Sequence, residues 1–167
     1  MYKKEEEKME EKKYTEKELT EAVRAAIQDR ATWFYLLLKA AKEAGVDDDK
    51  IAKKAITHYG KLKGKNFNDV KNAGDFVTKL STGVLKGAFD MERVVAEDNR
   101  GELKFKHCAL VEVWKKLGCT NKEIEDLCKM ANYGDYGMIS CFQGLELEFP
   151  KMISKGDSYC HMVVTKK

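Results

Sequence analysis

The sequence lacks a long hydrophobic run, an excess of one charge and, apart from Pro150, any proline. Its longest strongly apolar run, residues 33–38, is far shorter than the roughly 20 residues that a membrane helix needs. The formal net charge is only +3, and no basic block stands clear of acidic neighbours. We therefore expect neither a membrane protein nor a nucleic-acid-binding one.

An export signal is also missing, because residues 1–7 have no apolar core. The chain is therefore expected in the cytoplasm, where thiols are kept reduced. Its five cysteines then fit free, catalytic or metal-bound thiols better than disulfides, and their odd number leaves at least one unpaired.

What the sequence does contain is enough apolar material for one domain with a hydrophobic core. Apolar residues make up 43% and charged residues 35% of the 167 positions. Residues 1–18 are mostly Lys and Glu, whose charges almost cancel, and they predict a solvated lead that is helical or disordered. Residues 19–167 are predicted to form a single α+β domain.

Helical periodicity dominates the first half of the chain, with apolar residues recurring along one face. A capping box, Thr15 followed by Glu18, accompanies the first of these patterns. The first expected helix starts at Thr15 or Thr20 and ends at Gly45. The second starts at residues 47–49 and ends at Gly60, and the third starts at Asn66 or Asn68 and ends at residues 81–83.

The second half mixes strand and helix patterns. Pro150 is expected to end the third strand, because proline has no backbone donor for a sheet. The fold class is therefore α+β, with N-terminal helices followed by an antiparallel sheet of two β-hairpins (about four strands) covered by helices. The first hairpin is predicted from strands 89–96 and 103–107, and the second from strands 145–149 and 159–165. Between the hairpins we expect a helix over 108–117 and another that is capped by Thr120 or Asn121.

All five cysteines lie between His107 and His161, which are themselves adjacent to Cys108 and Cys160. Cys108 stands where a strand passes into a helix, and the positive end of the helix dipole is expected to lower the pKa of its thiol. If the last strand pairs beside the first hairpin, Cys160 or His161 approaches Cys108 across the sheet. This spacing indicates a reactive or metal-binding pocket.

The best carboxylate candidate is Asp135, in the glycine-punctuated segment 132–137. Placed in a turn before a short helix, it is either a helix N-cap or a general base or ligand for a substrate amine. Arg30 and Trp33 lie in the middle of the first helix. They are either surface residues or pocket residues, and an Arg fork suits a carboxylate substrate.

Simpler interpretations of the cysteines remain open. A free cysteine packs like a small hydrophobe, so Cys119 and Cys141 are expected to be structural, and Cys128 lies on the apolar side of its helix. The histidines form no CxxC or HxxxH pattern, which gives little support to a tetrahedral zinc site.

A set of segments carries a further signal: 29–33, 107–110, 114–118, 127–128, Asp135 and 155–161. Together they resemble the family of L-2-amino-thiazoline-4-carboxylic acid hydrolases, many of whose members come from anaerobic bacteria. The resemblance covers most of the chain after residue 20. It implies hydrolytic opening of a small ring that contains sulfur and nitrogen and bears a carboxylate.

The resemblance also implies roles for individual residues. Cys108 is the implied nucleophile or polariser, Asp135 the base and Cys160 a second thiol. The implied substrate-binding residues are Arg30, as a carboxylate clamp, Trp33, His107 and His161.

Two functions from different classes follow. The first is a hydrolase-like enzyme that acts on a small cyclic C–N/C–S amino-acid derivative, binds no cofactor and has a small-molecule substrate as its partner. The second is a non-catalytic domain that binds or senses a small ligand, a metal or a haem through Cys or His. A bound metal and a homo-oligomer are left open by the sequence.

Overall fold

The computed structural model describes residues 13–167, so residues 1–12 of the predicted charged lead lie outside the described part. No helix within residues 13–167 is long and apolar enough to cross a membrane. The elements are α1 (Glu16–Glu43), α2 (Asp48–Gly64), α3 (Ala73–Leu80), α4 (Val84–Ala88), β1 (Met91–Ala96), β2 (Arg100–Phe105), α5 (Ala109–Lys116), α6 (Asn121–Ile139), β3 (Leu145–Lys151), η1 (Ile153–Lys155) and β4 (Cys160–Lys166).

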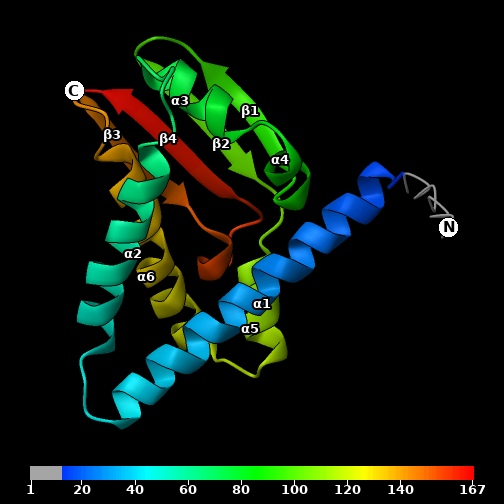
Figure 1. Ribbon diagram of the computed structural model, residues 1–167, viewed down its shortest axis with the longest axis vertical. Coiled ribbons are helices and arrows are strands. Elements are labelled where there is room, and N and C mark those ends of the chain that lie inside the picture. The colour runs from blue at the N-terminus through cyan, green and yellow to red at the C-terminus, as the bar shows by residue number, and fades with distance from the viewer. Residues whose placement is uncertain (1–12) are drawn as a thin grey trace, which may run out of the picture.

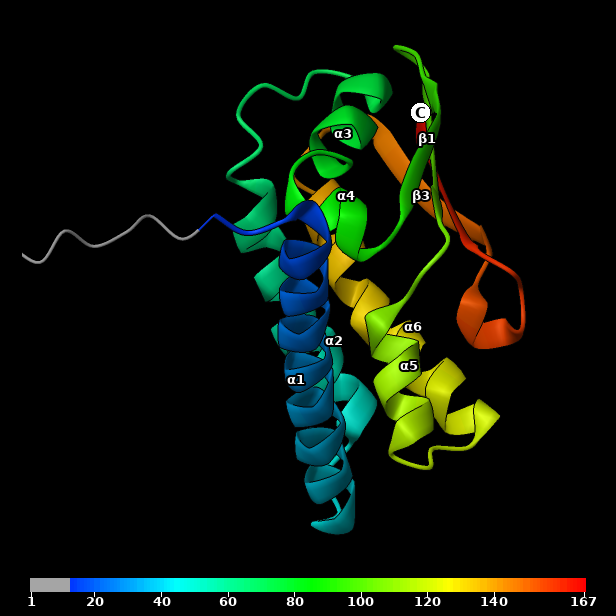
Figure 2. The same ribbon diagram turned by 90° about the vertical axis from the view of Figure 1, so that its right-hand side faces the viewer.

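The four strands form one antiparallel sheet in the order β1-β2-β4-β3, which confirms the predicted α+β class (Figure 1). Each hairpin is a pair of neighbouring strands, and β2 pairs with β4 to join them. Helix α3 packs on β1 and β2, α2 packs along α6, and α1 packs on α4 and α5. Figure 1 shows α1 crossing over α5, and Figure 2 shows the same helices from the side.

Two capping boxes set the starts of the long helices. Thr15, rather than Thr20, caps α1, and its hydroxyl accepts from the backbone N–H of Glu18. Thr120 and Glu123 make the same reciprocal pair at α6. Each such cap typically stabilises a helix by about 1 kcal/mol, because it satisfies backbone donors that have no partner inside the helix.

Glycines that predict helix ends instead allow two helices to touch. Helix α2 continues through Gly60, and α6 continues through Gly134 and Gly137, where a turn was expected. A Cβ on Gly60 would collide with the backbone of Gly134, and one on Gly137 would collide with the carbonyl of Thr57. The glycines are therefore contact points between helix backbones, and Asp135 lies within a helix rather than at an N-cap.

Three smaller expectations were also wrong. The third helix is capped by Asn72, not by Asn66 or Asn68, and the short α4 was not expected. Strand β3 runs past Pro150 to Lys151. The pairing register shifts between Glu148 and Lys151, and β3 is an edge strand, so a residue without an N–H is tolerated there.

The apolar interior consists of three clusters of buried side chains. The first centres on Trp114 of α5, whose Nε1 donates to the carbonyl of Ala31 in α1 over 3.0 Å. The second gathers Phe76 and Leu103 between α3 and the sheet. The third, around Ala109, lies under α4 and the start of α1. The candidate site lies where these clusters meet.

Candidate functional site

A cavity of about 440 Å³ lies between the helices and the sheet, and all three clusters contribute to its wall. This volume is within the range of small-molecule sites. Most of the wall is apolar. The polar residues and cysteines of the wall are Arg30, Tyr59, Lys63, His107, Cys108, Cys128, Asn132, Asp135 and Cys160.

Three thiols and one carboxyl share this cavity. Cys108 caps α5, Cys160 begins β4, and β4 pairs with β2 so that Cys160 faces Phe105. Cys128 and Asp135 lie about two turns apart on α6 and therefore on the same face. All four residues line the same cavity, and a charge on Asp135 contributes to raising the pKa of each thiol.

The Asp135 carboxyl is largely removed from water by the protein around it, and the residue lines the cavity. Removal from water raises the pKa of Asp135 from 3.8 to about 6, and the positive charge of Lys63 offsets only part of this rise. A carboxyl with such a pKa is mainly ionised at pH 7 and still accepts a proton readily.

The thiols are less acidic than the sequence predicts. Burial raises the pKa of Cys108, although the N–H groups of Val111 and Leu110 act in the opposite direction. Burial likewise raises the pKa of Cys128 to about 12 and that of Cys160 to about 11. The expected lowering at Cys108 was therefore wrong, because desolvation outweighs the helix N-terminus. These groups are neutral thiols near pH 7.

Two cations stand at the rim of the cavity. Arg30 of α1 donates from Nη1 to the hydroxyl of Tyr59 over 3.5 Å, and Lys63 Nζ lies 5.6 Å from the centre of the Tyr59 ring. Both cationic side chains are exposed at their ends of the wall. Tyr59 and Lys63 were not foreseen from the sequence. The feature of the sequence that could have indicated them is the spacing of Ile56, Tyr59, Gly60 and Lys63, which places all four on one face of α2.

Residues 24–164 match the family of L-2-amino-thiazoline-4-carboxylic acid hydrolases. The chain belongs to this family. No curated protein sequence matches it. The match spans most of the described chain and includes every residue of the cavity wall.

Two solved structures share the fold at low sequence identity. One is a trafficking protein particle complex subunit 3 from Naegleria fowleri covalently bound to palmitic acid. It has a TM-score of 0.58 and 12% identity over 86% of this chain and 96% of that one. The other is the phenol-responsive sensory domain of the transcription activator PoxR with phenol. It has a TM-score of 0.51 and 11% identity over 81% of this chain and 73% of that one.

Of the predicted site residues, Arg30, His107, Cys108, Asp135 and Cys160 line the cavity. The pKa of His107 is lowered, mainly by burial, so its imidazole is neutral near pH 7. Cys119 and Cys141 lie elsewhere; Cys141 is exposed at the end of α6. Cys128 also lines the cavity, although it was not among the predicted site residues. A cysteine on the apolar side of a helix can belong to the hydrophobic core or to a cavity wall, and the sequence does not distinguish the two.

Trp33 and His161 do not line the cavity. Trp33 follows the buried Ala31 by two residues, which turns it to the opposite side of α1, and it is 65% exposed. His161 follows Cys160 in β4 and therefore points to the other sheet face, where its Nε2 lies 2.8 Å from Glu102 Oε2.

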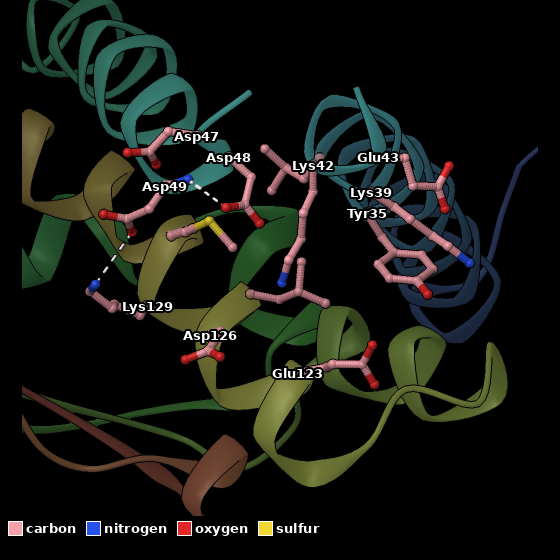
Figure 3. A pocket seen from close by; sticks show the side chains of 13 residues that line it. Tyr35, Lys39, Lys42, Glu43, Asp47, Asp48, Asp49, Glu123, Asp126 and Lys129 are labelled. Atoms are coloured by element: carbon pink, nitrogen blue, oxygen red, sulfur yellow. Dashed lines mark hydrogen bonds and ion pairs between the residues drawn. The ribbon is translucent and has the colours of Figure 1, made fainter. Parts of the chain in front are cut away.

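Residues 13–167 contain no group of three or more His, Cys, Asp or Glu side chains arranged to hold a metal ion. A second hollow, about 790 Å³ and more open, lies where α1 ends and α2 begins, beside α6 (Figure 3). Its acids and lysines partly neutralise one another, as Lys129 Nζ does at 3.3 Å from Asp49 Oδ1. It holds none of the cysteines. The cavity that holds the three thiols and Asp135 is therefore the candidate site.

Proposed function

We propose that this protein is a hydrolase that opens a small cyclic C–N/C–S amino-acid derivative of the 2-amino-thiazoline-4-carboxylate type. The observation that carries the proposal is the enclosed Asp135, whose pKa of about 6 fits a general base, in one cavity with Cys108, Cys128 and Cys160. Family membership supplies the substrate class. Reduced thiols in the cavity fit a cytoplasmic enzyme.

In this proposal Asp135 activates water. The water oxygen forms a bond to the amidine-like ring carbon while Asp135 takes one water proton and the π pair of the C=N bond moves onto its nitrogen. Collapse of this hydroxyl-bearing carbon to a C=O then breaks its bond to the ring sulfur or ring nitrogen. The hydroxyl proton passes to the nitrogen that took the π pair, and the leaving atom takes the proton from Asp135. The carboxylate is restored, and the products contain the substrate and one water molecule. General base catalysis of this kind typically contributes about 10²–10⁴-fold to a rate.

Cys108 acts as a polariser, because neutral thiols predominate near pH 7. Its S–H donates toward the ring nitrogen and makes the neighbouring carbon more electrophilic. Cys160 already accepts from the backbone N–H of Ile153 over 3.2 Å, which holds its sulfur in place. It serves as the second thiol and packs against the ring sulfur. Neutral thiols of this kind suit an uncharged ring.

Arg30 and Lys63 bind the substrate carboxylate at the rim. The planar guanidinium offers two parallel donors, and the ammonium adds a second positive charge from α2. The ring then extends inward toward the thiols and Asp135. His107, neutral and buried in the wall, gives the ring a partly polar neighbour.

The direct test is incubation of the purified full chain with 2-amino-thiazoline-4-carboxylate while the ring chromophore is followed. Asp135→Asn is expected to lower kcat by at least about 10²-fold, since it removes the base but keeps the shape. Cys141→Ser is the matched control, because that thiol is exposed and outside the cavity. No turnover by the wild type, or equal turnover by Asp135→Asn, would contradict the proposal.

A second candidate function is non-catalytic binding of an apolar small ligand. The observation in its favour is the largely apolar wall, formed by residues such as Phe34, Phe89, Phe105 and Met162. Two proteins of similar fold carry palmitic acid and phenol, respectively, in their structures.

Trp114 lies in the cavity wall and serves as a reporter for this alternative. Trp33→Phe would remove the exposed indole, so that the remaining tryptophan fluorescence comes from the wall. Titration with phenol or palmitate that changes this fluorescence, together with no turnover of the ring substrate, would favour a binding domain over an enzyme.

A further inference from the structure

Asn132 is a polar residue of the cavity wall that the proposed mechanism does not use. It belongs to α6, four residues after Cys128 and three residues before Asp135, so the three side chains follow one another along one face of the helix. All three line the cavity. The carboxamide of Asn132 therefore stands one turn from a thiol and one turn from the candidate base.

The carboxamide of Asn132 has no hydrogen-bond partner within residues 13–167. Polar side chains in a mostly apolar wall normally have one, because a carboxamide that leaves water without a partner loses its hydrogen bonds. The group offers a carbonyl oxygen as acceptor and an NH₂ group as donor. Both are free to bind a ligand in the cavity.

The row of side chains on α6 runs from the rim of the cavity inward. Helices α2 and α6 lie side by side (Figure 1). A Cβ on Gly64 of α2 would collide with the carbonyl of Met138. Lys63, the residue before Gly64, therefore lies near the Asp135 end of the row. Cys128, at the other end, is only 8% exposed.

The proposed substrate has the length to reach Asn132. Its carboxylate is held at the rim by Arg30 and Lys63, and its amino group is attached to the ring carbon that water attacks. This group points away from the carboxylate, because the two are attached to non-adjacent ring atoms. Asn132 lies roughly 4.5 Å further along the helix axis than Asp135, at about 1.5 Å per residue, which is within the span of a five-membered ring and its substituent.

We propose that Asn132 Oδ1 accepts a hydrogen bond from the exocyclic amino group of the substrate, an inference that rests on the proposed function. Asn132 is then the residue that selects rings with a 2-amino group over rings with an alkyl group in the same place. The ring nitrogen remains for the thiol of Cys108, and the attacking water remains for Asp135. The three side chains thus bind different atoms.

The selection has a physical cause on both sides of the contact. A 2-methyl group offers no donor, so it leaves the Asn132 carbonyl unpaired in the wall, whereas an amino group pairs with it. One hydrogen bond of this kind corresponds to about a tenfold difference in affinity.

The test compares the binding of 2-amino-thiazoline-4-carboxylate and 2-methyl-thiazoline-4-carboxylate. Trp114 fluorescence in the Trp33→Phe protein reports on the wall, and stopped-flow mixing records binding before turnover. The amino probe is expected to bind about tenfold more tightly than the methyl probe. Asn132→Leu should bind the two probes equally, with its affinity for the methyl probe little changed.

Asn132→Ala is a second variant, which removes the carboxamide without adding bulk and should lose the preference in the same way. Asn121→Leu is the matched control, because Asn121 is an exposed residue of the same helix outside the wall, and it should keep the preference. Circular dichroism confirms that each variant is folded.

The inference is overturned if the Trp33→Phe protein binds neither probe or binds both equally, or if the preference survives in Asn132→Leu and Asn132→Ala. Turnover of the amino probe is measured separately. Turnover without an Asn132-dependent preference contradicts this inference alone. A preference that depends on Asn132, together with no turnover, contradicts the hydrolase proposal and supports the contact with the amino group.

Discussion

Gly60 of α2 and Gly134 of α6 meet backbone to backbone, so closely that a Cβ on Gly60 would collide with the Gly134 carbonyl. Asp135 is the next residue in α6 and lines the cavity. The close approach of the two helices therefore determines where the candidate base stands. It also brings Lys63 of α2 near enough to lower the pKa of Asp135 against the effect of burial.

Gly60→Ala is expected to force α2 and α6 apart. Backbone atoms of Gly134 cannot move aside as a flexible side chain does, so we expect a loss of about 1–3 kcal/mol in the free energy of unfolding. Urea unfolding followed by circular dichroism measures this. Lys54→Ala, at an exposed position of α2, is the control and should cost nothing comparable. Equal stability of Gly60→Ala and wild type would show that α2 and α6 are less closely packed at Gly60 than the structure indicates.

Asp135→Asn is expected to stabilise the protein near pH 7. The carboxyl is more basic when folded, with a pKa of about 6 against 3.8, so the folded state binds more protons in that window. Stability of the wild type should therefore fall as pH rises from about 4 to 7, by on the order of 3 kcal/mol.

Asp135→Asn removes this dependence, and its advantage over wild type should vanish toward pH 4. Urea unfolding at several pH values compares the two proteins. The half-exposed Asp126, paired with Lys122, offers the control Asp126→Asn, which should bring no such gain. An Asp135→Asn protein less stable than wild type at pH 7 would mean that the carboxylate is well solvated or paired.

The cavity thiols are expected to react slowly with iodoacetamide. With a pKa of about 11, Cys160 is about 0.1% thiolate at pH 8, and Cys128 is lower still. The exposed Cys141 should be alkylated first, and mass spectrometry of peptides gives the order. Faster alkylation of Cys108 than of Cys141 would instead indicate a thiolate and favour the nucleophile role.

Lys63→Ala is expected to act on the site in two ways. It removes one cation from the rim, so KM for a carboxylate substrate should rise several-fold. It also removes a charge that lowers the pKa of Asp135, so the acid limb of the pH–rate profile should move to higher pH. Lys61→Ala, an exposed lysine of the same helix outside the wall, is the control. An unchanged acid limb would show that the charge of Lys63 does not lower the pKa of Asp135.

Much of the fold follows from local signals in the sequence. The Thr15 and Thr120 capping boxes mark helix starts, and alternation of apolar residues marks four strands that the structure pairs as two hairpins. These signals are readable because they depend on residues within a few positions of one another. The predictions from Pro150 and Gly60 were wrong, because the effect of Pro150 depends on a register shift in the sheet and that of Gly60 on a neighbouring helix.

The candidate site was predictable only in part. Cys108, Cys160 and Asp135 were identified, and the cavity contains all three. Trp33 was predicted together with Arg30, but only Arg30 lines the cavity, and Trp33 is 65% exposed on α1. The pKa of Cys108 was expected in the wrong direction, since burial depends on packing that a single helix does not reveal.

By itself the sequence determined the class of fold, the order of its four strands and the cysteine-rich stretch that supplies the thiols. Tertiary structure alone decided that Cys128 joins Cys108 and Cys160, that Lys63 approaches Asp135, and that His161 turns away. The physical reason is that spacing along the chain sets which face a side chain occupies, whereas the packing of α2 on α6 and of β4 on β2 sets which faces meet.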